Sequence, residues 1–439
     1  MSPSKVFIFI ACVMAGLAGL SMVLPGRVVY HEYELRWPTL AEVIGNPTTS
    51  QQESEEIEEE IEASLPEPQD TILPEPTKVI EEPRIEVPRV AVDSTVDSRV
   101  FLKSFYASLD QADTKKVRVL HYGDSQIEED RMTQQIREAL QSRYGGSGAG
   151  LLPLAQTIPS RTVRQRLVMN GKQIQPAQGP QRYMVYGPKR TQREDGLYGV
   201  MGQVAVMNDS LVSGSEEVIA ICTPQDNNAR YNTWRIFADS SVHYRTSGDS
   251  VYLSGKGSVY ALSQESKTGV IVDNIPMRGC LGTVFTKIDR QQLSSFYREQ
   301  NVTLIIMQFG GNAIPFNRNL STISSIVKGL REQVRYLQSC APEASILFIG
   351  PSDMLTQENG EWITYPMIPY MDRLLRKMAM EENIAYFSLF NYMGGAGSMA
   401  RWKENGLAGS DGIHFMRSGA RKAGNAVVQW ILEGEEMER

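Results

Sequence analysis

Along residues 117–141 the pattern of hydrophobic and polar positions changes from that of a strand to that of a helix. Residues 117–120 form a short β-branched and apolar run, which Gly123 and the aspartate after it interrupt. From residue 126 to residue 141 apolar positions recur every four to five residues, as they do on one face of a helix. The sequence therefore predicts a strand, a sharp turn and a helix, with Ser125 in the turn.

The alternation of strand and helix patterns resumes near residue 300. Residues 302–309 form a nearly continuous apolar run, which is expected for a strand that is covered on both faces of a sheet. Helical patterns at 100–109, 323–337, 367–380 and 418–432 alternate with further strand patterns at 346–349 and 385–389. Such alternation favours a parallel sheet with right-handed crossovers. We therefore predict an α/β domain built from residues 96–154 and 274–439.

Between residues 155 and 273 the pattern is different. Short runs of β-branched and aromatic residues are separated by Gly, Asn, Asp and Ser, and the last run is GVIVDN, which begins at Gly269. Repeated short strands with turn signals and little helical period favour a β-sandwich. We predict that a β-sandwich at 155–273, resembling a carbohydrate-binding module, is inserted into the α/β domain.

The first 95 residues lack the pattern of a folded domain. Residues 6–24 form an uncharged run of 19 residues, about the length of one membrane span. No small-x-small cleavage site follows this run, so we predict an uncleaved transmembrane anchor at 1–26, with a cleaved signal peptide as the alternative. Lipidation at Cys12 is disfavoured because the apolar run continues past it. Residues 27–95 are acidic and punctuated by proline, which predicts a solvated, disordered linker.

The net charge of −7 belongs mainly to this linker. Residues 53–86 hold 13 acidic side chains against Lys78 and Arg84, so the rest of the chain is near neutral. No dense stripe of lysine and arginine indicates a nucleic-acid partner. No cysteines and histidines have the spacing of a zinc site, and we expect neither a metal nor an organic cofactor.

Polar residues follow the predicted strands or lie in the loops beyond them. Ser125 follows the first strand, Asn312 follows the strand at 302–309, and Asp411 and His414 precede the last helix. Open α/β sheets keep their chemistry at the carboxyl edge. A serine that attacks an ester needs a base, a carboxylate that orients the base, and donors for the oxyanion. We predict that Ser125 attacks, that His414 accepts its proton, that Asp411 orients the imidazole, and that the Ser125 N–H, a glycine N–H and the Asn312 amide form the oxyanion hole.

The other three histidines fit the role of the base less well. His31 lies near the predicted anchor, His121 lies inside the predicted strand, and His243 lies in the β insert. Purely structural roles stay open for the candidate residues: a helix cap for Asp124, a turn for Asn312, and a surface pair for Asp411 and His414. Gln126, Glu128 and Glu129 are interpreted as first-turn helix residues, which the helix dipole favours there.

Four short blocks together resemble those of the GDSL (SGNH) hydrolases. They are Gly123-Asp124-Ser125, a glycine block at 279–282, Gly310-x-Asn312 and Asp411-x-x-His414, in the order of that family. The resemblance implies a three-layer, flavodoxin-like hydrolase domain with a parallel sheet. It also implies Ser125, His414 and Asp411 as the catalytic residues.

Two positions depart from the pattern of the family or leave it ambiguous. Ala313 stands where the third block of the family has an aspartate, although Asn312 is kept. Both Gly279 and Gly282 can supply the glycine N–H. We choose Gly282, because its spacing from Gly279 resembles the usual ending of this block, and so predict Ser125, Gly282 and Asn312 as the oxyanion hole.

Residues 123–153, together with the β insert that follows them, are similar to bacterial SGNH-type peptidoglycan O-acetylesterases. The similarity implies a serine esterase that removes O-acetyl groups from a cell-envelope glycan through an acyl-enzyme. With the predicted anchor, it implies a membrane-tethered enzyme that faces the periplasm. One alternative is an O-acetyltransferase that receives acetyl from a membrane acyltransferase partner and moves it to a polysaccharide hydroxyl. Another is a non-catalytic glycan-binding envelope protein.

Overall fold

The computed structural model describes residues 27–30, 33–36, 96–154, 160–169, 172–174, 190–193, 196–199, 218–224, 233–238, 241–255, 259–358 and 360–438. The chain divides into two compact units, residues 1–81 and 82–439. In the first unit β1 (Arg27–Tyr30) pairs antiparallel with β2 (Tyr33–Arg36), inside the segment predicted as linker. The predicted anchor at 1–26 and most of the linker lie outside the described residues. Within the described ranges, no helix combines the length and the hydropathy that a membrane crossing requires.

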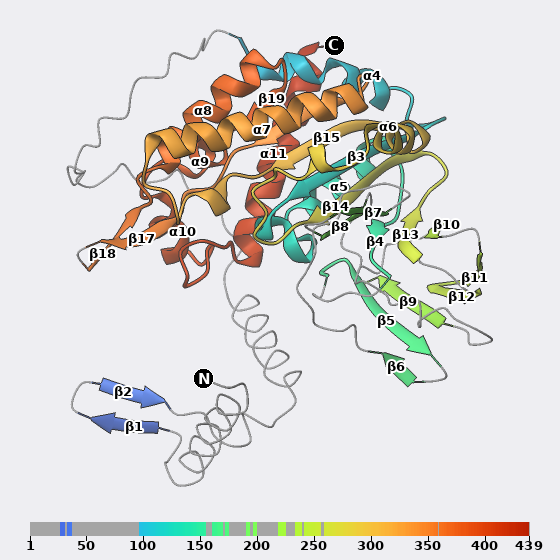
Figure 1. Ribbon diagram of the computed structural model, residues 1–439, viewed down its shortest axis with the longest axis horizontal. Coiled ribbons are helices and arrows are strands. Elements are labelled where there is room, and N and C mark those ends of the chain that lie inside the picture. The colour runs from blue at the N-terminus through green and yellow to red at the C-terminus, as the bar shows by residue number, and fades with distance from the viewer. Residues whose placement is uncertain are drawn as a thin grey trace. The chain divides into compact units, whose positions relative to one another are not determined.

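A five-stranded parallel sheet forms the centre of the second unit, in the order β14–β3–β15–β16–β19 (Figure 1). Its strands are β3 (Lys116–Gly123), β14 (Gly269–Pro276), β15 (Val302–Gln308), β16 (Ser345–Ile349) and β19 (Ala385–Phe387). Every residue of β15 and β16 is buried, which explains why their sequences are nearly continuous apolar runs. The predicted parallel α/β sheet is confirmed.

Helices cover both faces of this sheet and give three layers. They are η1 (Ser98–Leu102), α4 (Lys103–Leu109), α5 (Thr133–Tyr144), η4 (Phe285–Lys287), α6 (Arg290–Glu299), α7 (Leu320–Cys340), α8 (Ile368–Glu381), α9 (Leu389–Met393), α10 (Ser398–Glu404) and α11 (Arg417–Glu438). Helices α6, α7 and α8 pack on the face that carries Tyr122 and Met307. Helices α4, α5 and α11 pack on the face that carries Val119 and Ile306. Alternate residues of each strand therefore enter opposite layers of the core.

In the described part of the β insert, three and five strands form two larger antiparallel sheets. One has the order β10 (Thr233–Ala238), β13 (Val259–Glu265) and β4 (Gly150–Leu152), and the other has the order β11 (Val242–Ser247), β12 (Ser250–Gly255), β9 (Val218–Pro224), β5 (Val163–Met169) and β6 (Lys172–Ile174). A further pair is β7 (Arg190–Arg193) with β8 (Gly196–Gly199). Leu152 and Leu262 of the first sheet share one apolar cluster with Val163, Ala220 and Val251 of the second. Two sheets with a common core form a sandwich. The resemblance of this insert to a carbohydrate-binding module stays a prediction.

Both edges of the insert differ from the prediction. GVIVDN is not the last strand of the sandwich: β14 contains it and pairs in parallel with β3, from Gly269 opposite Lys116 to Pro276 opposite Gly123. At the other edge, β4 already pairs with β13, ahead of residue 155. The correction has a physical reason, because a short apolar run reads alike whether it is buried in a parallel sheet or in a sandwich. The remaining domain boundaries stay predictions.

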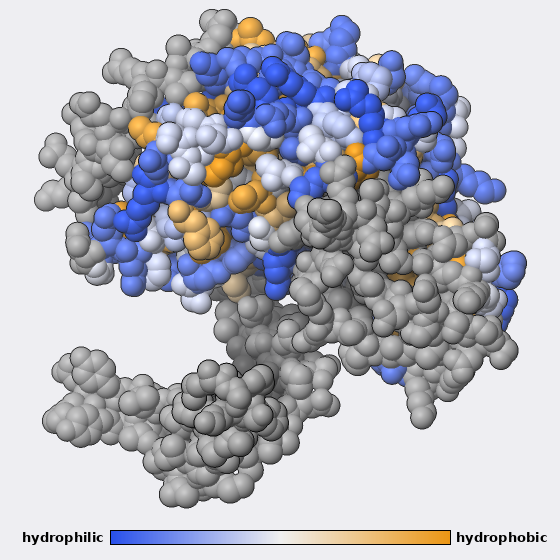
Figure 2. All heavy atoms as spheres, viewed as in Figure 1, coloured by the Kyte–Doolittle hydropathy of each residue, from blue (hydrophilic) through white to orange (hydrophobic). Residues whose placement is uncertain are grey.

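A buried ion network joins the central sheet to the sandwich. The fully buried Arg118 on β3 binds Asp273 on β14, with Nη1 2.8 Å from Oδ2, and also binds Glu265 on β13. Asp273 in turn accepts a hydrogen bond from the Leu151 N–H on β4 at 2.9 Å. These contacts join the sandwich to the edge of the sheet near the start of β3, whereas Ser125 follows its end. On the face shown in Figure 2, exposed hydrophobic residues gather near the centre of the described surface, among hydrophilic ones.

Candidate active site

Ser125 lies where β3 ends at the carboxyl edge of the sheet. The strand stops at Gly123, where a Cβ would lie 2.9 Å from Ile127 Cδ1, so glycine lets Ile127 pack closely against the end of the strand. Asp124 caps the short helix η2 (Ser125–Asp130), because its Oδ1 accepts a hydrogen bond from the Gln126 N–H at 3.0 Å. The predicted strand and turn are therefore present, and they fix Ser125 at the start of η2. The predicted helix is interrupted, because η2 ends at Asp130 and the regular helix α5 begins at Thr133.

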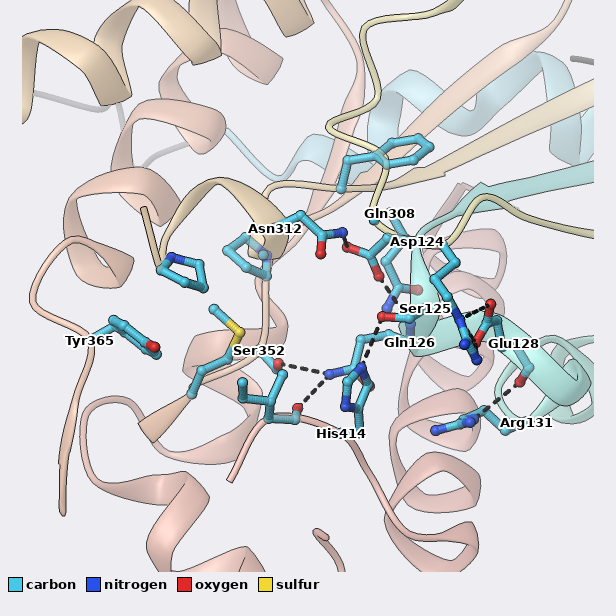
Figure 3. A pocket seen from close by; sticks show the side chains of 18 of the residues that line it. Asp124, Ser125, Gln126, Glu128, Arg131, Gln308, Asn312, Ser352, Tyr365 and His414 are labelled. Atoms are coloured by element: carbon cyan, nitrogen blue, oxygen red, sulfur yellow. Dashed lines mark hydrogen bonds and ion pairs between the residues drawn. The ribbon is translucent and has the colours of Figure 1, made fainter. Parts of the chain in front are cut away.

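The three predicted catalytic residues form one chain of hydrogen bonds. Ser125 Oγ lies 2.9 Å from His414 Nε2 (Figure 3), although 289 positions separate the two residues in the sequence. On the other side of the ring, His414 Nδ1 lies 2.7 Å from Asp411 Oδ2. This arrangement lets the imidazole accept the serine proton while the carboxylate holds the ring.

Asp411 is held as an anion. Partial burial raises the pKa of its carboxyl, but hydrogen bonds from the His414 side chain and from the Ile413 and His414 backbone N–H groups outweigh burial and lower the pKa to about 2. The two backbone bonds, at 2.9 and 3.0 Å, both reach Oδ1 and leave Oδ2 for the imidazole. Asp411 is thus charged throughout the range in which an imidazole titrates.

His121 lies in the packing of the sheet, as predicted from its strand position. Its Nε2 lies 3.1 Å from Gln308 Oε1, and its Nδ1 lies 2.9 Å from Thr133 Oγ1. Burial lowers the pKa of His121 to about 4, so the ring is neutral near pH 7. A fully buried imidazole with both nitrogens engaged is not placed to serve Ser125.

Asn312 lies in η5 (Gly311–Ala313), directly beyond the end of β15. Its Nδ2 donates to Asp124 Oδ2 at 3.2 Å and to the Cys280 carbonyl at 3.3 Å. Both hydrogen bonds are at the long end of the usual range. The Asn312 amide therefore lies beside the nucleophile. Because its two hydrogen bonds are long, one of its N–H groups can turn from a protein acceptor to a substrate oxygen.

The structure separates the two candidate glycines. Gly279 lines the cavity at Ser125, whereas Gly282 is not among the residues that line it. The Gly282 N–H donates to Cys280 Sγ at 3.2 Å, and a Cβ at this position would lie 2.6 Å from Phe309 Cγ. The choice of Gly282 is therefore corrected: this glycine is needed for packing, and Gly279 is the one near the nucleophile. The spacing of two glycines in one block could not show which of them faces the sheet edge.

Ser125 and His414 open into a cavity of about 730 Å³. Its lining includes three charged side chains, Glu128, Arg131 and Arg278, and a mostly apolar group, Pro315, Phe316, Pro351, Met354 and Tyr365. Figure 3 shows Glu128 and Arg131 on one side of Ser125 and Tyr365 on the other. Phe316 is 87% exposed, so its ring is available to a ligand. Among the described residues, no group of three His, Cys, Asp or Glu side chains is placed to hold a metal ion. The expectation that no cofactor is needed stays a prediction.

No family model and no curated protein sequence matches the chain. Among solved structures, a peptidoglycan O-acetylesterase matches with a TM-score of 0.59 and 18% identity, over 79% of this chain and 98% of its own. The chain has the fold of this O-acetylesterase. The predicted similarity to a peptidoglycan O-acetylesterase is thereby confirmed at the level of the fold.

Two further carbohydrate esterases match smaller parts of the chain. Est24, a carbohydrate acetylesterase from Sinorhizobium meliloti, has 15% identity and a TM-score of 0.28 over 37% of this chain and 79% of its own. A family 3 carbohydrate esterase from Clostridium thermocellum has 14% identity and a TM-score of 0.27 over 40% of this chain and 76% of its own. At these TM-scores neither match carries an argument.

Sequence analysis missed the roles of the residues that follow Ser125. Gln126 is not only a first-turn residue, because its Nε2 donates to the Ile413 carbonyl at 2.6 Å and so ties η2 to the loop that carries His414. Glu128 and Glu129 do not continue a regular helix: their φ,ψ angles are −56°,160° and 60°,9°. Three successive acidic residues after the serine were the available signal, but Arg278, the partner of Glu128, is 150 positions away in the sequence.

Proposed function

We propose that this protein is a serine esterase that removes O-acetyl groups from a glycan through an acyl-enzyme on Ser125. The observation that carries the proposal is the chain of hydrogen bonds from Ser125 Oγ through His414 to Asp411, at 2.9 and 2.7 Å, at the mouth of a cavity. The fold of a peptidoglycan O-acetylesterase supports the choice of an acetylated cell-envelope glycan as the substrate.

In the proposed reaction, His414 Nε2 accepts the proton of Ser125 as Oγ attacks the acetyl carbonyl. Negative charge develops on the carbonyl oxygen, and the N–H groups of Ser125, Gly279 and Asn312 would stabilise it. Collapse of this intermediate breaks the bond to the sugar oxygen, which takes the proton from His414. Water then gives its proton to His414 and attacks the acetyl-serine, which releases acetate and restores Ser125.

The cavity suits a sugar ester. The exposed Phe316 ring and Tyr365 offer apolar faces, and Glu128, Arg131 and Arg278 of the same lining offer charged donors and acceptors. A sugar ring presents C–H groups on its faces and hydroxyls at its edge, so it can satisfy both groups. We further propose that the uncharged run at 6–24 anchors the enzyme in a bacterial cell envelope, with the catalytic domain on the periplasmic side.

The test is acetate release from isolated O-acetylated peptidoglycan by the full chain purified in detergent. Ser125→Ala should reduce acetate release to background and should leave the melting temperature near that of the wild type. Ser108→Ala is the matched control, because this serine lies on α4 and its hydroxyl donates to the Ser104 carbonyl of the same helix at 2.9 Å. If Ser125→Ala released acetate at the wild-type rate, the proposal would be refuted.

Transfer of the acetyl group to a sugar hydroxyl uses the same first half of the reaction. Adding an unacetylated oligosaccharide to the same assay, followed by mass spectrometry, separates the two outcomes: an esterase yields acetate, and a transferase yields the acetylated acceptor. Labelling of Ser125 by a fluorophosphonate reports the activated serine independently of the glycan. A folded sample that neither labels nor releases acetate would favour the non-catalytic glycan-binding alternative.

A further inference from the structure

The proposed oxyanion donors belong to three separate segments of the chain. Ser125 follows β3, Gly279 follows β14, and Asn312 follows β15. Backbone hydrogen bonds join these segments near the ends of the strands, where the Met277 N–H donates to the Gly123 carbonyl at 2.7 Å. Past this point the segments leave the sheet, so side-chain contacts must set the positions of their N–H groups.

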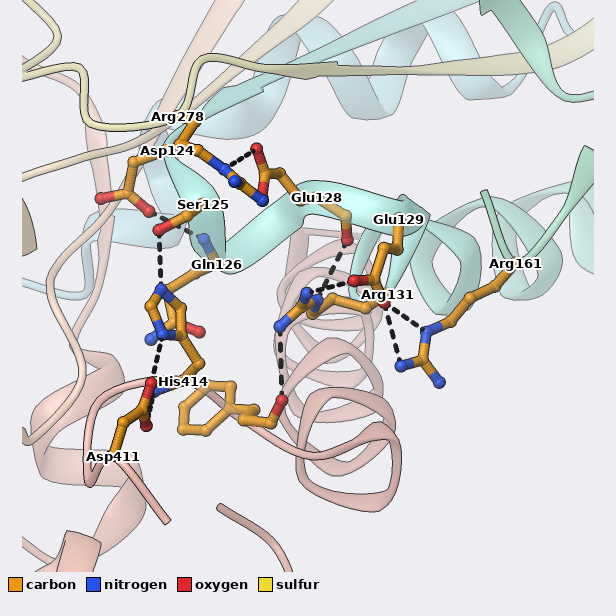
Figure 4. A network of polar contacts seen from close by, with 11 residues as sticks. Asp124, Ser125, Gln126, Glu128, Glu129, Arg131, Arg161, Arg278, Asp411 and His414 are labelled. Carbon is orange, nitrogen blue, oxygen red and sulfur yellow. Dashed lines mark hydrogen bonds and ion pairs between the residues drawn. The ribbon is translucent and has the colours of Figure 1, made fainter. Parts of the chain in front are cut away.

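One such contact joins the segment of Ser125 to the segment of Gly279 (Figure 4). Arg278 Nε lies 2.8 and 2.9 Å from the two carboxylate oxygens of Glu128, and Arg278 Nη2 lies 2.6 Å from Oε2. The Glu128 side chain is only 2% exposed, whereas that of Arg278 is 58% exposed. A buried carboxylate is strongly disfavoured without a partner, so this pair holds its geometry firmly.

The Glu128–Arg278 pair is one side of a closed set of three connections. Arg278 directly precedes Gly279, and Cys280 directly follows it. The Cys280 carbonyl accepts a hydrogen bond from Asn312 Nδ2, and the same Nδ2 donates to Asp124, the neighbour of Ser125. Each proposed donor segment is therefore tied to both of the others, and Gly279 is held from both sides.

The backbone of η2 is shaped so that Glu128 reaches Arg278. Glu129 and Asp130 have φ angles of 60° and 66°, which non-glycine residues seldom adopt and which persist only where the surroundings enforce them. Their own partners enforce them here: Glu129 binds Arg131 at 2.9 Å and Arg161 at 3.1 Å, and Asp130 binds Arg137. Glu129 and Asp130 thus share a positive-φ conformation directly after the extended Glu128, whose side chain reaches the glycine segment through Arg278.

We propose that Glu128 and Arg278 act as a positioning pair that holds the Gly279 N–H beside the Ser125 N–H, so that both can face the same oxyanion. The inference rests on the proposed function and adds to it residues that do not themselves touch the reacting atoms. A pair of this kind acts through geometry, and small displacements of oxyanion donors are costly in rate.

The first test is steady-state hydrolysis of p-nitrophenyl acetate by the full chain carrying Arg278→Gln. We expect kcat to fall about 10- to 100-fold and KM to change by less than about threefold, because the donors act on the transition state more than on the bound ester. Arg335→Gln is the matched control: Arg335 is 61% exposed, and its pair with the buried Glu382 has distances of 2.7 and 2.8 Å between α7 and α8, outside the cavity. The control should keep the kcat of the wild type.

The second test separates a tether from a charge. Arg278→Ala is assayed with and without added guanidinium chloride at tens of millimolar, which can replace the charge of the lost group but cannot hold the backbone of Gly279. Activity should stay low on addition. Recovery toward the wild-type kcat would overturn the proposal and would show that the guanidinium acts directly on the substrate or the oxyanion.

A double-variant cycle completes the experiment. Glu128→Gln, Arg278→Gln and the double variant should lose similar amounts of activity if the two residues act as one unit, because either change alone breaks the connection. Independent, multiplying losses would contradict the proposal, as would an Arg278→Gln enzyme with the wild-type kcat. If Glu128→Gln fails to fold, the kcat and KM of the surface variant Arg278→Gln still test the proposal by themselves. Inactivity of the wild type itself would instead show failure of the proposed function.

Discussion

Replacing Asp124 with asparagine should change the stability of the protein in opposite directions at high and low pH. The carboxyl is buried beside the nucleophile and accepts hydrogen bonds from the Gln126 N–H at 3.0 Å and from Asn312 Nδ2 at 3.2 Å. Burial raises the pKa of Asp124 from its ordinary 3.8 to about 6; the neighbouring Glu128 also raises the pKa, and His414 opposes the rise.

The sign follows from proton binding. The folded protein keeps the Asp124 proton up to about pH 6, whereas the unfolded chain releases it near pH 3.8. The contribution of this group to the free energy of unfolding therefore falls as the pH rises from about 4 to 6. The difference between these two pKa values corresponds to a cost of about 3 kcal/mol above pH 6.

Asparagine removes this cost but also loses a contact. Its oxygen can still accept from the Gln126 N–H, but its amide nitrogen would meet the amide of Asn312, a loss of about 1 kcal/mol. We therefore expect Asp124→Asn to be more stable than the wild type by about 2 kcal/mol at pH 8 and less stable by about 1 kcal/mol at pH 4.

The assay is urea unfolding of the full chain in detergent, followed by tryptophan fluorescence between pH 4 and pH 8. Asp113→Asn is the control, because this carboxyl is exposed and lies in the turn before β3, outside the cavity. The control should show no change of sign. A constant difference between Asp124→Asn and the wild type across this range would refute the reasoning, because it would mean that Asp124 does not titrate differently on folding.

The remaining predictions concern the triad and the two glycines. Asp411→Asn should lower kcat by roughly 10²- to 10⁴-fold and leave the melting temperature nearly unchanged, because the side chain is 46% exposed but holds the tautomer of His414. Because the pKa of Asp411 is about 2, protonation of this carboxyl should not cause any fall of the wild-type kcat above pH 4. If kcat fell with acid above pH 4 in the wild type but not in Asp411→Asn, this prediction would be wrong. Gly282→Ala should lower the free energy of unfolding by about 1–3 kcal/mol, because its φ is 82° and a Cβ would meet Phe309, while the folded enzyme keeps its kcat. Gly279→Ala should instead lower kcat, and the reverse pattern in the two variants would restore Gly282 to the oxyanion hole.

Hydrophobic periodicity predicted the central sheet well, because its strands are buried on both faces. The runs that became β15 and β16 are nearly continuous, with Thr303, Gln308 and Ser345 as their polar residues, and every residue of both strands is buried. The same argument failed at β14, whose apolar run is equally consistent with the neighbouring sandwich. Only pairing with β3 decides which sheet contains this strand, and pairing is a contact between residues some 150 positions apart.

The amino-acid sequence by itself determined the type and order of the site residues. Ser125, Asn312, Asp411 and His414 were identified because chemistry restricts which side chains can attack, accept a proton or hold an imidazole. Local pattern also placed each of them beyond a strand or before a helix. The structure brings all four to the same cavity or its edge.

Tertiary structure alone decided which glycine and which charges belong to the site. Gly279 and Gly282 have similar sequence contexts, and their roles separate only because Phe309 packs over one of them. The acidic residues after Ser125 read as helix-terminal, yet Glu128 is paired with Arg278, 150 positions away. The physical reason is that burial and ion pairing depend on which segments meet in space, and local propensity carries no information about partners that are distant in the chain.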